Sequence, residues 1–129
     1  MPASKMRTAG LSGMKVNFLK DLARHVARGS VDFKKMRRMT DEEVIGYLTR
    51  VKGIGRWSAE MFLMFSLGRP DVFSYGDLGL RNAMRNLYGL SKHPTARQAE
   101  KISAAWRPYR TLASRYLWAS VDLKAPAKS

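Results

Sequence analysis

The sequence predicts an all-α protein, a helical bundle or barrel in a single domain. Apolar residues recur at intervals of three and four through several segments, as in Val44, Tyr47, Leu48 and Val51, and this is the period of a helix with one buried face. Most of these segments end at a glycine, and none shows the alternating pattern of a strand. A chain of 129 residues suits one domain. We expect that domain to span residues 1–120 and to be followed by a disordered tail, rich in Lys, Pro and Ala, over residues 121–129.

The composition favours a polyanionic partner. The chain has 24 Lys and Arg against 10 Asp and Glu, a net charge of +14, which on so small a domain indicates nucleic acid more often than a solvated basic surface. No helix sets a broad apolar face against a purely basic one, so we expect no membrane partner. There is no signal-peptide pattern, and we expect a protein that is not secreted. The absence of cysteine excludes disulfides, zinc-thiolate sites and iron–sulfur clusters.

The first half of the chain predicts three helical segments. Ser12 is suited to cap a helix that runs to Arg28 and stops at Gly29. A short helical turn is expected within 31–39. Thr40 followed three residues later by Glu43 is a capping box, which opens a helix running to about Val51. That structural role accounts for the acidic residues at 41–43, so we assign them no chemistry.

A turn with two glycines separates this helix from the next one, and the two helices with their turn form a hairpin over residues 44–65. The turn is Lys52, Gly53, Ile54 and Gly55, followed by Arg56. The backbone N–H groups at the start of a helix are unpaired and lie at the positive end of its dipole. Glycine lets a large ligand approach closely, and Lys52 and Arg56 add charge. These five residues therefore predict a phosphate-binding helix-hairpin-helix. The alternative is an ordinary corner whose glycines only relieve strain.

The second half predicts four more helices. The second hairpin helix begins at Arg56 or Trp57, ends at Gly68 and is expected to be the most buried of the domain. Asp77 opens a helix that stops at Gly89. Thr95 and Gln98 form a second capping box, and Pro108 suits the first turn of the last helix. The buried stripe of that last helix is predicted to comprise Leu112, Ala113, Tyr116 and Leu117.

The segment GIGRWSAEMFLMFSLGRPDVFSYGDLGL, residues 53–80, resembles the core of the helix-hairpin-helix DNA glycosylases that carry a Gly/Pro-rich loop and an aspartate. Within that superfamily it is most similar to the 3-methyladenine DNA glycosylases, and the resemblance extends from about Gly10 to Trp118. It implies base excision repair, in which an alkylated purine is flipped out of double-stranded DNA and its N-glycosidic bond is hydrolysed. It also implies a location with the DNA, in the cytoplasm or nucleoid of a prokaryote or the nucleus of a eukaryote.

The resemblance assigns roles to three side chains. Asp77, at the end of the loop over residues 68–77, matches the catalytic aspartate, and a helix cap is a compatible second role. Trp57 stands where relatives that also cut the backbone have a Schiff-base lysine, which implies hydrolysis without lyase activity. Its indole can stack on an electron-poor base, or it can simply fill the core. Tyr75 is expected in the same base pocket, whereas Asp71 is expected to be structural.

The family also suggests a cation site, but no other cofactor. The main-chain carbonyls of Thr49, Val51 and Ile54 would hold a monovalent cation, Na or K, against a DNA phosphate. Carbonyl oxygens are suitable ligands for a hard cation.

Two departures from the family pattern keep alternatives open. A proline often precedes the catalytic aspartate, but here the residues are Ser74, Tyr75 and Gly76. Full-length relatives also have several helices before the segment that matches Gly10. We therefore expect a fragment, one half of a split enzyme that needs a partner chain, or a minimal form, with exposed apolar faces that favour self-association. A non-catalytic module that binds duplex DNA without sequence preference, and a protein–protein adaptor, are the competing functions.

Overall fold

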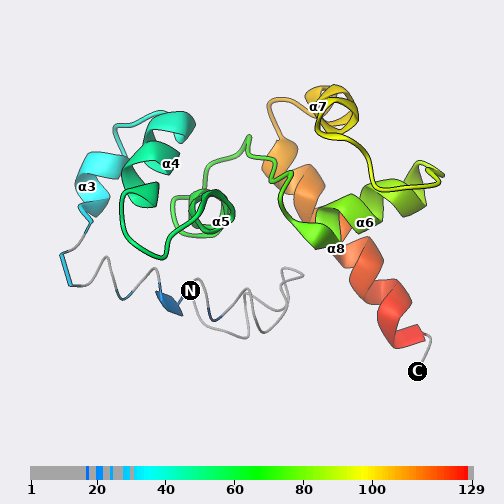
Figure 1. Ribbon diagram of the computed structural model, residues 1–129, viewed down its shortest axis with the longest axis horizontal. Helices are drawn as coiled ribbons and strands as arrows, with labels where there is room; N and C mark the ends of the chain where they lie inside the picture. The colour runs from blue at the N-terminus through cyan, green and yellow to red at the C-terminus, as the bar shows by residue number, and fades with distance from the viewer. Residues whose placement is uncertain (1–16, 18–19, 22–23, 25–27, 30, 128–129) are drawn as a thin grey trace.

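The computed structural model describes residues 17, 20–21, 24, 28–29 and 31–127, and this part of the chain contains helices and no strand (Figure 1). The helices that can be bounded are α3 (Phe33–Met36), α4 (Asp41–Thr49), α5 (Arg56–Phe65), α6 (Leu78–Leu87), α7 (Ala96–Ala104) and α8 (Arg110–Ala127). The prediction of an all-α fold is confirmed. None of these helices combines the length and the hydropathy needed to cross a bilayer.

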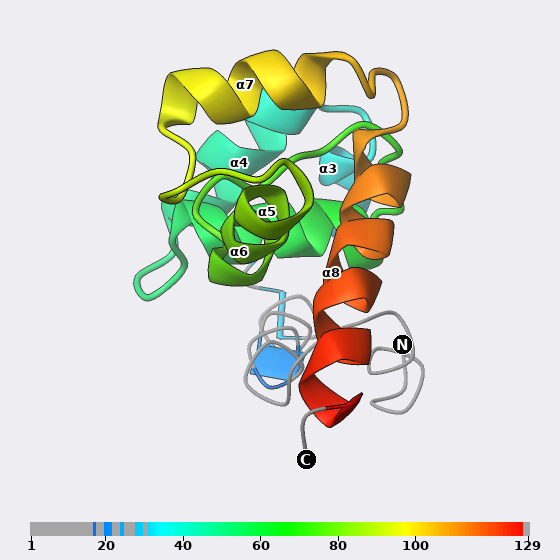
Figure 2. The same ribbon diagram turned by 90° about the vertical axis from the view of Figure 1, so that its right-hand side faces the viewer.

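Helix α5 is the centre of the molecule. Eight of its ten residues are buried, from Ser58 to Phe65, which confirms that it is the most buried helix. Helix α4 packs against α5, and α6 packs against α8. Figure 2 shows α7 lying across one end of the molecule and α8 running along its side. The loop from α5 to α6 therefore crosses from the α4–α5 pair to the α6–α8 pair (Figure 1).

Local capping sets most helix boundaries where the sequence predicts them. Thr40 with Glu43 and Thr95 with Gln98 both form complete capping boxes. Asp77 caps α6 by accepting a hydrogen bond from the backbone N–H of Leu80, at 2.9 Å from Oδ2. Gly89, which follows α6, has φ 65°, the left-handed conformation that ends helices.

Helix α8 corrects three predictions. It begins at Arg110, so Pro108 lies outside its first turn; the first helical bond runs from the Ala113 N–H to the Tyr109 carbonyl. The predicted buried stripe is wrong in part, since Leu112 is 51 % and Tyr116 70 % exposed. Between Arg110 and Val121, where burial is described, the buried residues of this helix are Thr111, Ser114, Leu117 and Trp118.

The physical reason is that polar side chains with partners occupy the buried face. Thr111 Oγ1 donates to the Arg69 carbonyl at 2.7 Å, and Ser114 Oγ donates to the Arg110 carbonyl at 2.8 Å. A prediction based on apolar residues alone therefore places the buried face of the helix about one residue away from its observed position. The helix also continues to Ala127, so the disordered tail predicted from Val121 is wrong up to that residue. No strong helix breaker precedes Pro126, and Leu, Lys and Ala are good helix formers.

The first predicted helix, from Ser12 to Arg28, falls largely outside the described residues. Gly29, expected to end it, has φ 77°.

Candidate active site

The carboxylate of Asp77 is the most completely enclosed acidic group of the described residues, at 1 % exposed. Its Oδ1 accepts a hydrogen bond from the indole N–H of Trp57 at 2.9 Å. Its Oδ2 accepts from the indole N–H of Trp118 at 2.7 Å and from the backbone N–H of Leu80. In each of these contacts the carboxylate is the acceptor, as an ionised carboxylate requires.

Three elements meet at this carboxylate. Trp57 lies in the first turn of α5, Asp77 is the N-cap of α6, and Trp118 lies in the middle of α8. Trp118 is buried and packs against Phe65, with ring centroids 5.7 Å apart. Trp57 is only partly buried. The aspartate therefore has a fixed, enclosed side at Trp118 and a partly open side at Trp57.

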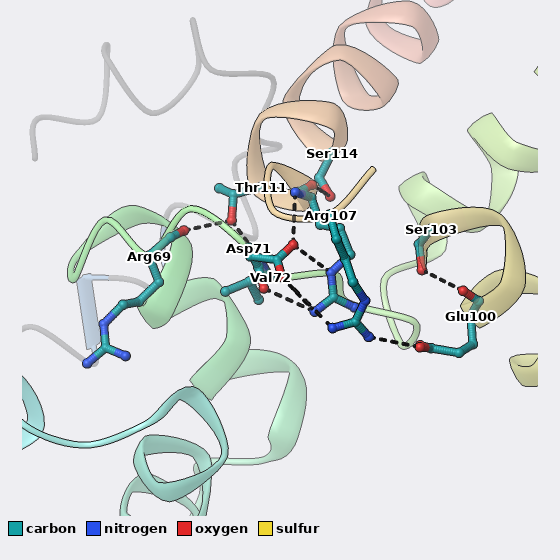
Figure 3. Close-up of polar contacts among 9 residues, drawn as sticks. Arg69, Asp71, Val72, Glu100, Ser103, Arg107, Thr111 and Ser114 are labelled. Atoms are coloured by element: carbon teal, nitrogen blue, oxygen red, sulfur yellow. Dashed lines mark hydrogen bonds and ion pairs between the residues drawn. The ribbon is translucent and has the colours of Figure 1, made fainter. Parts of the chain in front are cut away.

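The beginning of the Asp77 loop is tied to α8. The backbone N–H and Nε of Arg110 both donate to Asp71 Oδ1, at 3.2 and 2.8 Å (Figure 3). Although burial raises the pKa of Asp71, the hydrogen bonds and charge of Arg110 outweigh it and lower that pKa. Thr111 completes the attachment, since its N–H donates to the Pro70 carbonyl and its Oγ1 accepts from the Val72 N–H. Asp71 thus has the structural role expected of it.

Arg69 ties the same loop to the other side of the molecule. Its guanidinium donates to Asp41 Oδ1 at 2.8 Å and to the carbonyl of Met39, also at 2.8 Å. It therefore joins the loop to the start of α4. With both attachments in place, the loop that carries Asp77 spans two packed helix pairs and is fixed to each.

The α4–α5 turn contains two glycines with different backbone conformations. Gly53 has φ 92°, and Gly55, the N-cap of α5, has φ −94° and ψ −179°. Gly55 supplies no side-chain cap to α5, whereas Asp32, Thr40, Asp77 and Thr95 cap their helices. The turn projects from the helices in Figure 2.

The side chains around this turn differ in their surroundings. Lys52 is exposed, whereas Ile54 is buried in the core. Arg56 points back toward the protein, and its guanidinium donates to Glu42 at 2.7 Å and to Glu60 at 3.3 Å. Its charge is therefore shared with two carboxylates, and the hydrogen bond from Arg56 lowers the pKa of Glu42.

A cleft of about 410 Å³ lies beside the loop, but it is not built around Asp77. Tyr75 and Glu60 line it, together with Arg107, and neither Trp57 nor Asp77 does. The hydroxyl of Tyr75 donates to the Pro94 carbonyl, and the Arg81 guanidinium lies over its ring. The structure thus brings Trp57 to Asp77 and places Tyr75 on a separate hollow.

The hairpin carbonyls are compatible with a cation, although they are not a strong site by themselves. Thr49 is the last residue of α4, where helix carbonyls have no intrahelical donor. The Val51 carbonyl accepts from the Ile54 N–H at 3.1 Å, which leaves it a second lone pair. Within the described residues, no group of three or more His, Asp or Glu side chains offers a metal site.

Sequence reasoning gave no role to three residues that the structure makes important. Trp118 binds Asp77 from 41 positions away, and Arg110 holds Asp71 from 39 positions away. Glu60 is buried beneath the loop, where its Oε1 accepts from Ser74 Oγ at 2.7 Å. A polar residue inside the apolar run of α5 is the only signal that could have singled out Glu60.

The site thus combines a helical hairpin, a loop and a buried aspartate held by two indoles, the arrangement of a helix-hairpin-helix domain. Residues 1–108 match the model of the HhH-GPD superfamily of base excision DNA repair proteins, and the chain belongs to that superfamily.

One curated relative and two solved structures illustrate the similarity. DNA-3-methyladenine glycosylase 1 of Schizosaccharomyces pombe is 43 % identical over 119 residues, which cover 92 % of this chain and 52 % of the relative. The structure of the 3-methyladenine DNA glycosylase of S. pombe in complex with abasic DNA matches with TM-score 0.67 and 42 % identity, over 92 % of this chain and 58 % of that one. A DNA-3-methyladenine glycosidase from Bacillus halodurans matches with TM-score 0.68 and 39 % identity, over 98 % and 58 %. The chain thus spans about half the length of these relatives.

Proposed function

We propose that this chain acts in base excision repair as a monofunctional DNA glycosylase that hydrolyses the N-glycosidic bond of alkylated purines. The observation that carries the proposal is the Asp77 carboxylate, held by the indoles of Trp57 and Trp118 next to a glycine hairpin. Membership of a superfamily of base excision DNA repair proteins supports it, as do relatives named 3-methyladenine glycosylases.

The chemistry needs one carboxylate and one water. As the bond between C1′ and the base nitrogen breaks, its electron pair leaves with the base and positive charge develops on the sugar. The charge of Asp77 would stabilise that sugar, and a water adds to C1′ and loses a proton to leave an abasic site. N-alkylation has already made the purine cationic, so the departing base is neutral and no acid is required.

The substrate would enter from the side of Trp57, because that indole is the partly exposed one of the two donors. We propose that its face stacks on the flipped, electron-poor base. Tryptophan cannot form a Schiff base, so the reaction stops at the abasic site. Tyr75 lines a separate cleft, and a contact with the base would require the loop to move.

The hairpin would hold the DNA backbone. We propose that the N–H groups of α5, which Gly55 leaves without a side-chain cap, bind a phosphate together with Lys52. Arg56 would contribute through its backbone N–H, because Glu42 and Glu60 already pair with its guanidinium. A monovalent cation on the carbonyls of residues 49, 51 and 54 would supply a further positive charge.

A non-catalytic DNA-binding module is the second candidate, and one observation favours it. Both oxygens of Asp77 are already hydrogen-bonded and the residue is almost fully enclosed, which is also what a purely structural helix cap requires. In that case the hairpin binds duplex DNA and no base is released.

The test is base release from a duplex that carries 3-methyladenine or 7-methylguanine. We expect the wild type to release the base and to leave a site that breaks only after alkali. Asp77→Asn should lose roughly a hundredfold or more in rate while keeping its affinity for DNA. Its amide oxygen, placed as Oδ2, keeps the cap and the Trp118 bond, whereas the charge and the bond from Trp57 are lost. Asp32→Asn is the matched control, since Asp32 is also the N-cap of a helix and lies outside the site.

Three results would contradict the proposal. Binding without base release by the wild type would establish the module. Equal rates for Asp77→Asn and the wild type would remove Asp77 from the chemistry. A covalent adduct trapped by borohydride on abasic DNA would mean that a lysine performs lyase chemistry.

A further inference from the structure

Glu60 is a buried charged residue that the proposed chemistry does not use. It lies on α5 at 5 % exposed, among apolar neighbours of the same helix. Its two oxygens have different partners, since Oε1 accepts from the Ser74 hydroxyl at 2.7 Å and Oε2 accepts from the Arg56 guanidinium at 3.3 Å. Burial raises the pKa of Glu60, and the contacts with Ser74 and Arg56 oppose that rise. A carboxylate kept in such a place needs both partners.

One of these partners leads directly to Asp77. Ser74 is completely buried, and its carbonyl accepts the backbone N–H of Asp77 at 3.1 Å. The Ser74 hydroxyl is fixed by Glu60, so this carboxylate attaches the turn that presents Asp77 to α5, in addition to the bond from Trp57 to Asp77.

The other partner leads to the hairpin. Arg56 is the first residue of α5, next to Trp57, which donates to Asp77 Oδ1. Glu60 therefore contacts two segments that each bind Asp77. One is the Ser74 backbone, and the other is the first turn of α5, which carries Trp57. Glu42 also binds Arg56, but it is exposed and lies on α4.

We infer that Glu60 is a positioning residue, which holds the Ser74–Asp77 turn and the Trp57 turn of α5 in register so that Asp77 and its indole donor keep their geometry. This inference rests on the proposed function for its effect on rate, but not for its effect on geometry. Glu60 does not touch the substrate; it acts through Ser74 and Arg56.

Two pairs of variants test the inference. Glu60→Gln keeps the shape, but an amide has one acceptor oxygen and cannot accept from both donors. Its control is Glu42→Gln, the same change on the other carboxylate that binds Arg56. Ser74→Ala removes the hydroxyl that Glu60 holds, and Ser114→Ala removes another fully buried serine hydroxyl.

We expect Glu60→Gln and Ser74→Ala to lower kcat for base release by about tenfold or more with KM for damaged DNA unchanged, because small displacements of a reacting group are costly. The two controls should stay within about twofold of the wild type, since neither touches the turn that carries Asp77.

The second readout does not depend on activity. The indole N–H of Trp57 gives an NMR signal that can be assigned by its loss in Trp57→Phe. Glu60→Gln and Ser74→Ala should shift that signal, and Glu42→Gln and Ser114→Ala should not. The inference is wrong if all four variants have the same Trp57 signal and the same rate of base release. It is also wrong if Glu60→Gln changes only KM. If the wild type releases no base, the proposed function fails, and the Trp57 signal alone decides the role of Glu60.

Discussion

At the scale of single residues, the two indoles that donate to Asp77 differ in how firmly the surrounding protein holds them. Trp118 is 2 % exposed and wedged against Phe65, so its indole N–H cannot turn away from the carboxylate without repacking the core. Trp57 lies in the first turn of α5 and is partly exposed, so it has more freedom. Trp118 therefore fixes the carboxylate, and in the proposed function Trp57 would be the donor that responds to a nucleotide.

This difference predicts the effect of Trp118→Phe. The variant removes a hydrogen bond to a buried carboxylate, a loss of about 1.5–3 kcal/mol in the free energy of unfolding, and it lowers the rate of base release. Trp106→Phe makes the same chemical change in a partly buried ring that packs on Phe73, and it should cost less. Denaturant unfolding of the two variants gives the comparison, and equal losses would contradict the role assigned to Trp118.

The parts of this site that were predictable from sequence depend on neighbours in the chain. Thr40 and Glu43, or Asp77 and Leu80, are three positions apart, and helix geometry alone brings them together. The Trp118–Asp77 and Arg110–Asp71 contacts join residues about 40 positions apart. No local pattern encodes such pairs, since they depend on how α6 packs on α8. The face of α8 was misjudged for the same reason, because the buried hydroxyl of Thr111 has its partners in a distant loop.

At the scale of elements, the two glycines of the hairpin have different reasons to be glycine. Gly53 has φ 92°, which a side chain strains, so its identity serves the turn itself. Gly55 has an ordinary extended backbone, and a Cβ built there would meet nothing within 4 Å. Glycine at position 55 also suits the N-cap of α5, and in the proposed function its missing side chain would let a phosphate approach the backbone.

Gly55→Val therefore separates binding from folding. We expect the melting temperature to stay close to that of the wild type, and affinity for duplex DNA to fall by roughly tenfold, the value of one charge-assisted contact of about 1.5 kcal/mol. The loss should be the same for every DNA sequence, because phosphate contacts carry no base information. Gly46→Val, at an open position of α4, is the control for fluorescence-anisotropy titrations. Unchanged binding by Gly55→Val would remove the hairpin from the DNA interface.

At the scale of the whole molecule, the acidic side chains are largely engaged in ion pairs, whereas most of the basic side chains are in excess. Many carboxylates are ion-paired within the protein, among them Asp41 with Arg69, Asp71 with Arg110 and Glu100 with Arg107. These pairs hold the loop and the helix ends in place. They leave the excess of +14 to lysines and arginines that can face a polyanion.

Binding to duplex DNA should consequently be sensitive to salt. With only two phosphates neutralised, raising the salt from about 50 to about 200 mM should weaken binding by roughly tenfold, and more contacts steepen the loss. Titrations at several salt concentrations give the slope of log K against log salt. A flat slope would mean that the positive charge does not contact the backbone, and a protein–protein adaptor would then be the better account.

Helix α8 contacts the start of the Asp77 loop through Arg110 and Thr111, and its end through Trp118. Arg110 and Trp118 lie about two turns and ~12 Å apart along the helix axis. The spacing of Arg110 and Trp118 along the helix therefore sets the distance between Asp71 and Asp77. It also sets the direction from which the Trp118 indole approaches the carboxylate. One residue inserted between Arg110 and Trp118 would move the Trp118 side chain by about 1.5 Å along the helix axis and rotate it by about 100° around that axis. The number of residues between Arg110 and Trp118 is therefore as constrained as the identity of any side chain in the site. The same insertion beyond Trp118 would leave both contacts in place.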